Sequence, residues 1–291
     1  EMSASLVGSE MCIRDSYITG RFENTHADFA DYAQQMINEW KIDQEISFED
    51  TDVFDSPKTV FGKIILNKPF ICSVWSFCYY YHVLHEEYVV PYYNEGKLNK
   101  NNILDQAESL YRWGKSLQGS FSQWPQGMPM PQQHNDNPTI NIVNQIFLYA
   151  MDFIMCHEFA HIDKAPQQGT PIEQELEADD VAFDLLLKGC DGKNDTTIYL
   201  GIIMALATLL ILNPKIEDSE SHPNSLSRLD AFVKKINLPE THTLWCILTI
   251  IIHDWNMRYD LGFDFPKESD TFKSRYEEMI EIINAQVSKN N

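Results

Sequence analysis

The feature that most restricts the fold is the end of a long apolar run, where two histidines and a glutamate appear in the order H-E-x-x-H. They are His157, Glu158 and His161. On a helix, positions i and i+4 lie on one face with Cβ atoms about 6 Å apart. Both imidazoles could therefore reach one zinc ion at roughly 2.0–2.1 Å. The spacing predicts a helix that carries two zinc ligands, with Glu158 beside them as a general base.

A competing interpretation makes these residues two surface histidines and a solvated glutamate. The preceding segment, 140–156, is apolar nearly all round and predicts a buried helix. Asn137 and Pro138 supply an N-cap and a first-turn proline. Because polar side chains at the end of a buried helix need partners, this context favours the metal site.

A second helix is predicted at residues 170–187. Thr170 and Glu173 have capping-box spacing, and Pro171 falls at the first helical position. Lys188 and Gly189 predict the end of the helix. Glu173 therefore has a structural role.

A catalytic zinc site needs a third protein ligand, and Glu175 and Glu177 are the candidates. The short connection between the helices predicts an antiparallel return, which brings Glu175 toward His161. Asp179 lies four residues after Glu175 on the same face and could accept the outer N–H of a ligand histidine. We prefer Glu175 with Asp179, and the choice between Glu175 and Glu177 stays open.

The sequence resembles known families at these positions. HEFAH, the Glu175–Asp179 segment and the His222–Arg228 segment together resemble the HExxH, ExxxD and HPxxxxR pattern of HtpX-type metallopeptidases. The run ExEADxxAxxLL is similar to ImmA-type regulatory metallopeptidases. Length, the central HExxH and a helical N-terminal part most resemble the Lit phage-exclusion peptidases. The gap between His161 and Glu175 is shorter than in HtpX-type enzymes, so the shared feature is the site architecture.

The resemblance implies a gluzincin-like site. Glu175 would be the third ligand, Asp179 would orient a ligand histidine, and His222 or Arg228 would lie near the oxyanion. Glu158 would activate the zinc-bound water for attack on a peptide carbonyl. His222 is the candidate oxyanion donor, with Tyr149 as a substitute. Alternatively, His222 belongs to the start of a helix and Arg228 pairs with a buried acid.

Charge and cysteine content restrict partners and compartment. Lysine and arginine number 22 against 43 for aspartate and glutamate, a formal net charge of −21. This charge disfavours nucleic acid as a partner. A protein or peptide substrate is expected from the metallopeptidase pattern. The 6 cysteines form no C-x-x-C pattern, and the first residues lack signal-peptide features, so a cytoplasmic location is expected. The uncharged segment 198–212 is shorter than the ~20 residues that a membrane-spanning helix needs. A buried helix is therefore favoured over membrane association.

We expect a mainly α fold with a small sheet beside the metal helix. Residues 1–16 resemble translated sequencing-adapter read-through and are treated as a non-native leader. Residues 17–118 form an N-terminal helical region with one strand, Val60–Asn67, a candidate substrate platform. Residues 119–291 form the metallopeptidase core and C-terminal helices.

The sequence thus predicts a zinc-dependent metallopeptidase, and the Lit-like version acts in phage exclusion. Two alternatives remain: an ImmA-like regulatory protease, and an interaction protein that uses its metal only for stability. The second would fill all four zinc positions with protein ligands. A protease embedded in a membrane would require residues 198–212 to face lipid.

Overall fold

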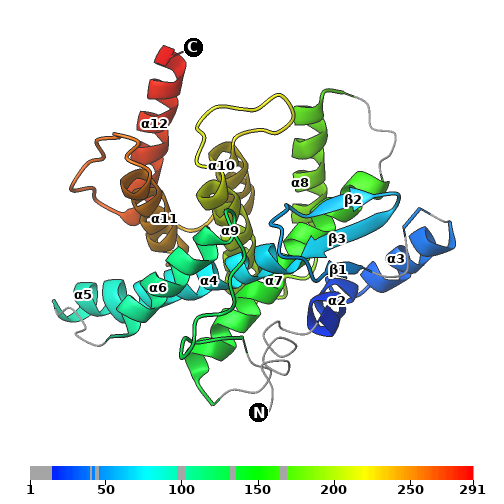
Figure 1. The fold of residues 1–291 in the computed structure, drawn as a ribbon. Coiled ribbons are helices and arrows are strands. Elements are labelled where there is room, and N and C mark those ends of the chain that lie inside the picture. The colour runs from blue at the N-terminus through cyan, green and yellow to red at the C-terminus, as the bar shows by residue number, and fades with distance from the viewer. Residues whose placement is uncertain are drawn as a thin grey trace. The chain divides into compact units, whose positions relative to one another are not determined.

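The computed structural model describes residues 15–39, 41–42, 46–96, 102–131, 136–163 and 169–290. These residues are mostly helical with one small sheet, as predicted (Figure 1). The predicted leader lies outside the described residues except for its last two positions. The chain divides into two compact units, Glu1–Ala205 and Leu206–Asn291. The boundary expected between residues 118 and 119 falls inside the first unit, because helices on either side of it pack together.

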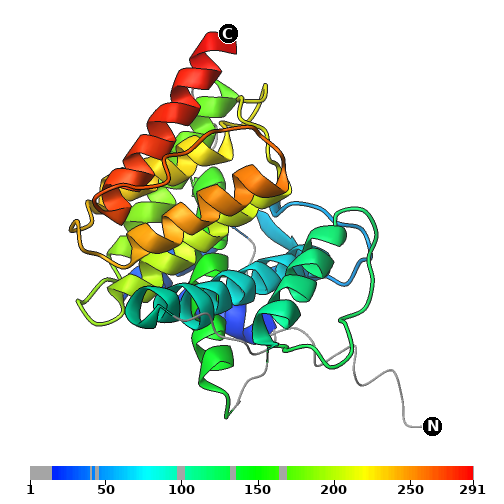
Figure 2. The ribbon, with the colours of Figure 1, turned by 90° about the vertical axis from the view of Figure 1, so that its left-hand side faces the viewer.

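The helices of the first unit include the two predicted at residues 140–156 and 170–187 and those of the predicted N-terminal helical region. They are α2 (Asp15–Glu23), α3 (Phe29–Asn38), α4 (Lys68–Leu84), the π-helical turn η1 (His85–Val89), α5 (Val90–Glu95), α6 (Ile103–Ser116), α7 (Pro138–Asp163) and α8 (Pro171–Leu187). Helix α7 contacts α2, α4 and α8, and α4 lies beside α6 (Figure 2). Helix α7 therefore forms the centre of this unit.

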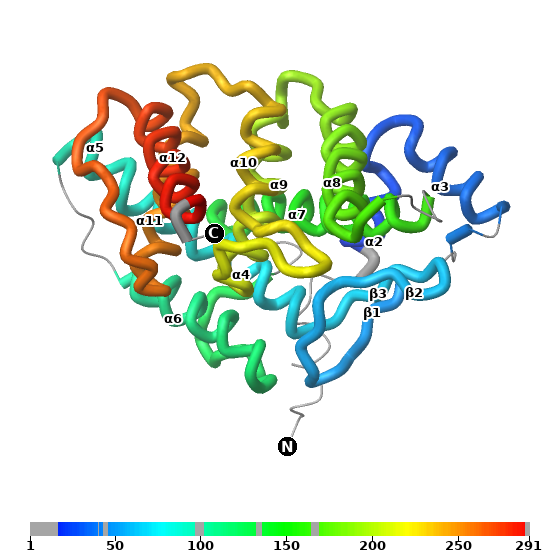
Figure 3. The backbone as a smooth tube through the Cα atoms, turned by 90° about the horizontal axis from the view of Figure 1, so that it is seen from above, coloured from blue at the N-terminus to red at the C-terminus, as the bar shows by residue number. Residues whose placement is uncertain are grey.

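The sheet corrects one prediction. Val60–Asn67 is not a single strand but the turn and second arm of a hairpin, in which β2 (Lys58–Val60) pairs antiparallel with β3 (Lys63–Asn67). Strand β1 (Ser47–Glu49) pairs parallel with β3 on its other side, so the order is β1-β3-β2 (Figure 3). Phe61 and Gly62 have φ of 50° and 78°, as in the primed turns that two-residue hairpins favour. Because β3 is central, β2 is the edge strand that contacts α7.

Helix α7 is buried along most of its length, as its apolar composition predicts. It begins at Pro138, and the side-chain oxygen of Asn137 accepts a hydrogen bond from the Thr139 N–H at 2.9 Å. In its second turn, Asn144 accepts a hydrogen bond at 2.9 Å from the indole N–H of Trp75 on α4. A buried polar pair of this kind fixes how α7 packs against α4.

Helix α8 starts with the predicted capping box. Thr170 accepts from the Glu173 N–H, and the Glu173 carboxylate accepts from the Thr170 N–H at 2.7 Å. At the other end, Gly189 does not have the left-handed backbone that a C′ glycine usually adopts. A Cβ there would lie 2.7 Å from the Thr25 carbonyl oxygen. Gly189 therefore permits close contact with the N-terminal segment.

Helix α9 (Asp195–Leu212) passes from the first unit into the second. A Cβ on Gly201 would lie 2.3 Å from the Tyr149 Cβ, so glycine allows α9 to approach the backbone of α7. Within the described residues, α7 and α9 are the helices long and apolar enough to cross a membrane. Most of the apolar window of each, 67% for α7 and 61% for α9, is buried inside the protein, as in a core helix.

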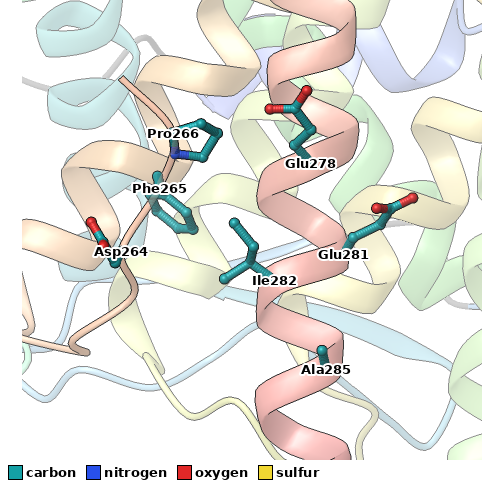
Figure 4. Close-up of a pocket in the computed structure, with 7 residues that line it drawn as sticks. All are labelled: Asp264, Phe265, Pro266, Glu278, Glu281, Ile282 and Ala285. Atoms are coloured by element: carbon teal, nitrogen blue, oxygen red, sulfur yellow. The ribbon is translucent and has the colours of Figure 1, made fainter. Parts of the chain in front are cut away.

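The second unit contains the helices α10 (Ser225–Ile236), α11 (Leu244–Arg258) and α12 (Phe272–Asn290). Helices α11 and α12 pack together, and Asn224 caps α10 by accepting from the Ser227 N–H at 2.8 Å. A groove of about 510 Å³ separates residues 264–266 from α12, and Ile282 points across it toward Phe265 (Figure 4). Its lining has three carboxylates and no histidine or cysteine: Asp264, Phe265, Pro266, Glu278, Glu281, Ile282 and Ala285.

Candidate metal centre

The last two turns of α7 bring two imidazole nitrogens to one point. The Nε2 atoms of His157 and His161 lie 3.1 Å apart. His157 is buried, whereas the His161 side chain is 22% exposed. The i, i+4 spacing thus produces the geometry predicted from the sequence, with the more accessible histidine at the helix end.

Helix α8 adds a carboxylate to this pair. Glu175 places Oε2 at 3.3 Å from His157 Nε2 and Oε1 at 3.3 Å from His161 Nε2. Around a zinc ion bound at roughly 2.0–2.1 Å, tetrahedral donor atoms are roughly 3.3 Å apart. The two imidazole nitrogens are separated by close to that value, and each carboxylate oxygen lies at that distance from one of them. With one ligand atom from each residue, the donors lie within 4.8 Å of one another, which leaves room for one metal ion between them.

The structure distinguishes the two candidate glutamates by burial. The Glu175 side chain is 13% exposed and faces the histidines, whereas Glu177 is exposed. Positions two residues apart on a helix point in different directions. Glu177 is not among the grouped donors His157, His161 and Glu175, whose ligand atoms lie within 4.8 Å of one another. The assignment of Glu175 as a zinc ligand remains a prediction, now with a geometric basis.

Asp179 lies one turn further along α8 and contacts the other nitrogen of His157. Its Oδ1 is 3.0 Å from His157 Nδ1, and the residue is 2% exposed. A carboxylate accepts a hydrogen bond, so this contact places the imidazole proton on Nδ1 and leaves the Nε2 lone pair facing His161 and Glu175. Partners of this kind orient metal-ligating histidines.

Glu158 lies next to the histidine pair and is 7% exposed. Its Oε2 accepts a hydrogen bond at 3.0 Å from the hydroxyl of Thr59 on the edge strand β2. Thr59 could not be predicted from the sequence, because 99 residues separate it from Glu158 and no motif links the two positions. The alternation of exposed and half-buried residues in β2 indicates only that Thr59 faces inward.

A buried polar cluster on the α2 side supports the same stretch of α7. Asp152 is fully buried and accepts from the Thr25 hydroxyl at 2.6 Å and from Arg21 Nε at 3.1 Å. Burial raises the pKa of Asp152 to about 6, while Thr25 and Arg21 act in the opposite direction. The Cys156 thiol contacts Asp152 at 3.8 Å, and burial raises its pKa too, so it stays a thiol at neutral pH.

An aromatic cluster packs on the motif itself. Phe159 makes edge-to-face contacts with Phe22, Phe29 and Tyr32, at ring-centroid distances of 6.1, 5.5 and 5.5 Å. The Tyr32 hydroxyl donates to Asp163 at the end of α7. Burial, followed by the hydrogen bond to Asp163, raises the pKa of Tyr32. Helices α2 and α3 thus hold the motif from the side opposite to a metal.

His222 and Arg228 belong to the second unit. His222 is exposed, with its Nδ1 2.7 Å from the Ser221 hydroxyl, and Arg228 is buried within α10. The proposed metal ligands belong to the first unit, and the oxyanion roles of His222 and Arg228 remain predictions. Tyr149 has the Arg21 guanidinium 4.8 Å from its ring centroid, and burial raises its pKa.

Comparisons with known proteins give a consistent assignment. The peptidase U49 family matches residues 64–248, which include α7, α8 and the described contacts between them. The cell death peptidase of Escherichia coli K12 is 24% identical over 180 residues, which are 57% of this chain and 61% of that protein. The chain therefore spans less than two thirds of the relative's length. No solved structure matches.

Proposed function

Because the chain belongs to the peptidase U49 family, and so is a peptidase that acts on protein substrates, we propose that it is a zinc-dependent metallopeptidase. His157, His161 and Glu175 would hold the ion, and Asp179 would orient His157. The observation that carries the proposal is the convergence of these three side chains, whose ligand atoms lie within 4.8 Å of one another.

Each side chain has a chemical role in this proposal. A zinc ion held there would polarise the substrate carbonyl and lower the pKa of a water molecule. Glu158 would take the proton from the attacking water and transfer it to the leaving amine. The edge strand β2 would pair with an extended substrate, which makes β2, and not the whole Val60–Asn67 segment, the candidate platform.

Zinc content tests the ligand assignment. We expect about one zinc per chain in the purified protein and in Glu158→Gln, and a large loss in Glu175→Ala. Glu177→Ala is the matched control, because it removes an exposed carboxylate from the same helix. Equal zinc content in both alanine variants would contradict Glu175 as a ligand.

Cleavage tests the catalytic role. We expect the wild-type protein to generate new peptide termini in a proteome-derived peptide library, read by mass spectrometry. Glu158→Gln should not do so, because the amide cannot accept the proton. Equal cleavage by the zinc-loaded wild-type and Glu158→Gln proteins would point to a different base. A wild-type protein that holds zinc but cleaves no peptide would favour the interaction-protein alternative.

We also propose that the peptidase acts in phage exclusion. Support comes from the similar Escherichia coli protein, whose name describes a cell death peptidase. The test is plaque formation by a phage panel on cells that express the wild-type protein or Glu158→Gln. Phage numbers that fall only with the wild-type protein would support the role, and equal plaquing on both strains across the panel would contradict it.

A further inference from the structure

Thr59 contacts the proposed general base twice. Its hydroxyl oxygen lies 3.0 Å from Glu158 Oε2 and 3.0 Å from the Glu158 carbonyl oxygen. One hydroxyl carries a single proton, so it donates to one acceptor at a time, and hydrogen bonds to a charged carboxylate are the stronger ones. The Glu158 side chain is thus held at the strand that faces it.

The hairpin fixes Thr59 in this position. Strand β2 pairs Val60 with Lys63 across the two-residue turn, and Thr59 with Ile64. Lys58 and Val60 are exposed and Thr59 is half-buried, so the alternation of the strand points the Thr59 side chain toward α7. Opposite a two-residue turn the first pair exchanges hydrogen bonds, so the next pair does not, and the Thr59 backbone groups face the outer edge of the sheet.

Gly62 allows the turn of the hairpin to lie close to the backbone of Lys41. A Cβ at this position would lie 2.6 Å from the Lys41 carbonyl oxygen. The contact from Lys41 to Gly62 and the contact from Thr59 to Glu158 lie on the same hairpin, three residues apart. The hydroxyl is therefore presented by a strand whose hairpin turn packs closely against Lys41.

We propose that Thr59 is a positioning residue for the reaction. By donating to Oε2 it sets the rotamer of Glu158 and leaves Oε1 to accept the proton of the attacking water. The inference rests on the proposed function, because it assigns a partner to the general base. It also links the base to the edge strand, since the same residue presents its backbone to that edge.

Metal-dependent binding of acetohydroxamic acid tests this proposal without a known substrate. The probe gives up its hydroxamate proton to a neighbouring carboxylate when it binds a metal. Its affinity for the cobalt-substituted full chain is read from visible absorption. We expect Thr59→Val to bind it about tenfold more weakly, as for the loss of one hydrogen bond to a charged group, at equal cobalt content.

Two further variants separate positioning from folding. Thr59→Ser keeps the hydroxyl and should bind within about twofold of the wild-type protein. Thr196→Val removes an exposed threonine hydroxyl on α9 and should have no effect. If Thr59→Val does not fold, Thr59→Ala removes the same hydroxyl.

The outcomes separate the two proposals. Wild-type affinity in Thr59→Val, with weakened binding in Glu158→Gln, would overturn the role of Thr59 and leave the zinc peptidase in place. A wild-type protein that binds no cobalt would overturn both. For a single peptide that the library identifies as a substrate, a loss in kcat at unchanged KM in Thr59→Val, restored in Thr59→Ser, would support positioning.

Discussion

Asp179 offers the sharpest test of the metal centre, because it touches a predicted ligand without being one. Its carboxylate oxygen lies 3.0 Å from His157 Nδ1, and its side chain is only 3% exposed. Hydrogen bonds to charged groups contribute about 1.5–3 kcal/mol, and removal of such a partner typically costs 10–100-fold in metal affinity. We therefore expect Asp179→Ala to weaken zinc binding by about 100-fold.

The zinc affinity of the amide variant should fall between those of the wild-type protein and Asp179→Ala. Asp179→Asn keeps an acceptor oxygen near His157 Nδ1 but loses the charge, so we expect about a tenfold loss. The apparent zinc dissociation constant is measured at pH 7 by competition with a chromophoric chelator. In Asp179→Ala, the buried Nδ1–H loses its acceptor, which should also lower the free energy of unfolding of the apo protein by about 1–3 kcal/mol.

Asp180 provides the matched control. It is the next residue on α8, it is exposed, and Asp180→Asn changes the net charge by the same amount as Asp179→Asn. The control should bind zinc as the wild-type protein does. Equal affinities for the Asp179 and Asp180 variants would refute the orienting role of Asp179.

Three other predictions concern stability. Burial raises the pKa of Asp152 from 3.8 to about 6. The contribution of this carboxyl group to the free energy of unfolding is therefore full below pH 4 and is lost as the pH rises through 6. In urea unfolding, the wild-type protein should therefore lose about 3 kcal/mol relative to Asp152→Asn between pH 4 and 7, and a constant difference would contradict this. Gly62→Ala should lower the free energy of unfolding by about 1–3 kcal/mol, because its Cβ would clash with a backbone carbonyl oxygen and its φ is positive. Gly20→Ala is the control and should not lower it, because its Cβ would meet nothing within 4 Å. Thr170→Ala should cost about 1 kcal/mol in urea unfolding through loss of the capping box, and an unchanged midpoint would refute the role of the cap.

Local patterns predicted the two helices that carry the candidate metal ligands. The spacing of His157 and His161, the capping box at Thr170 and the i, i+4 relation of Glu175 to Asp179 all lie within one or two helical turns. Such relations follow from helix geometry, which the sequence specifies directly. The short connection then leaves the two helices few ways to return, so the facing of α7 and α8 could be anticipated as well.

The remaining features depend on contacts between distant segments. Thr59 reaches Glu158 across 99 residues, and Arg21 reaches Asp152 across 131. The hairpin was missed because Phe61 adopts a positive φ that non-glycine residues seldom take, so the apolar run read as one strand. The oxyanion roles of His222 and Arg228 came from a resemblance, and they involve residues of another unit.

The order of synthesis is a consequence of how the first unit is built. Thr59 on β2 is made first, then the α7 histidines and Glu158, then Glu175 and Asp179, all before residue 206, where the second unit begins. Every group assigned to the metal and the base has therefore been translated before any residue of the second unit. The contacts that bring these groups together therefore all lie within the first unit.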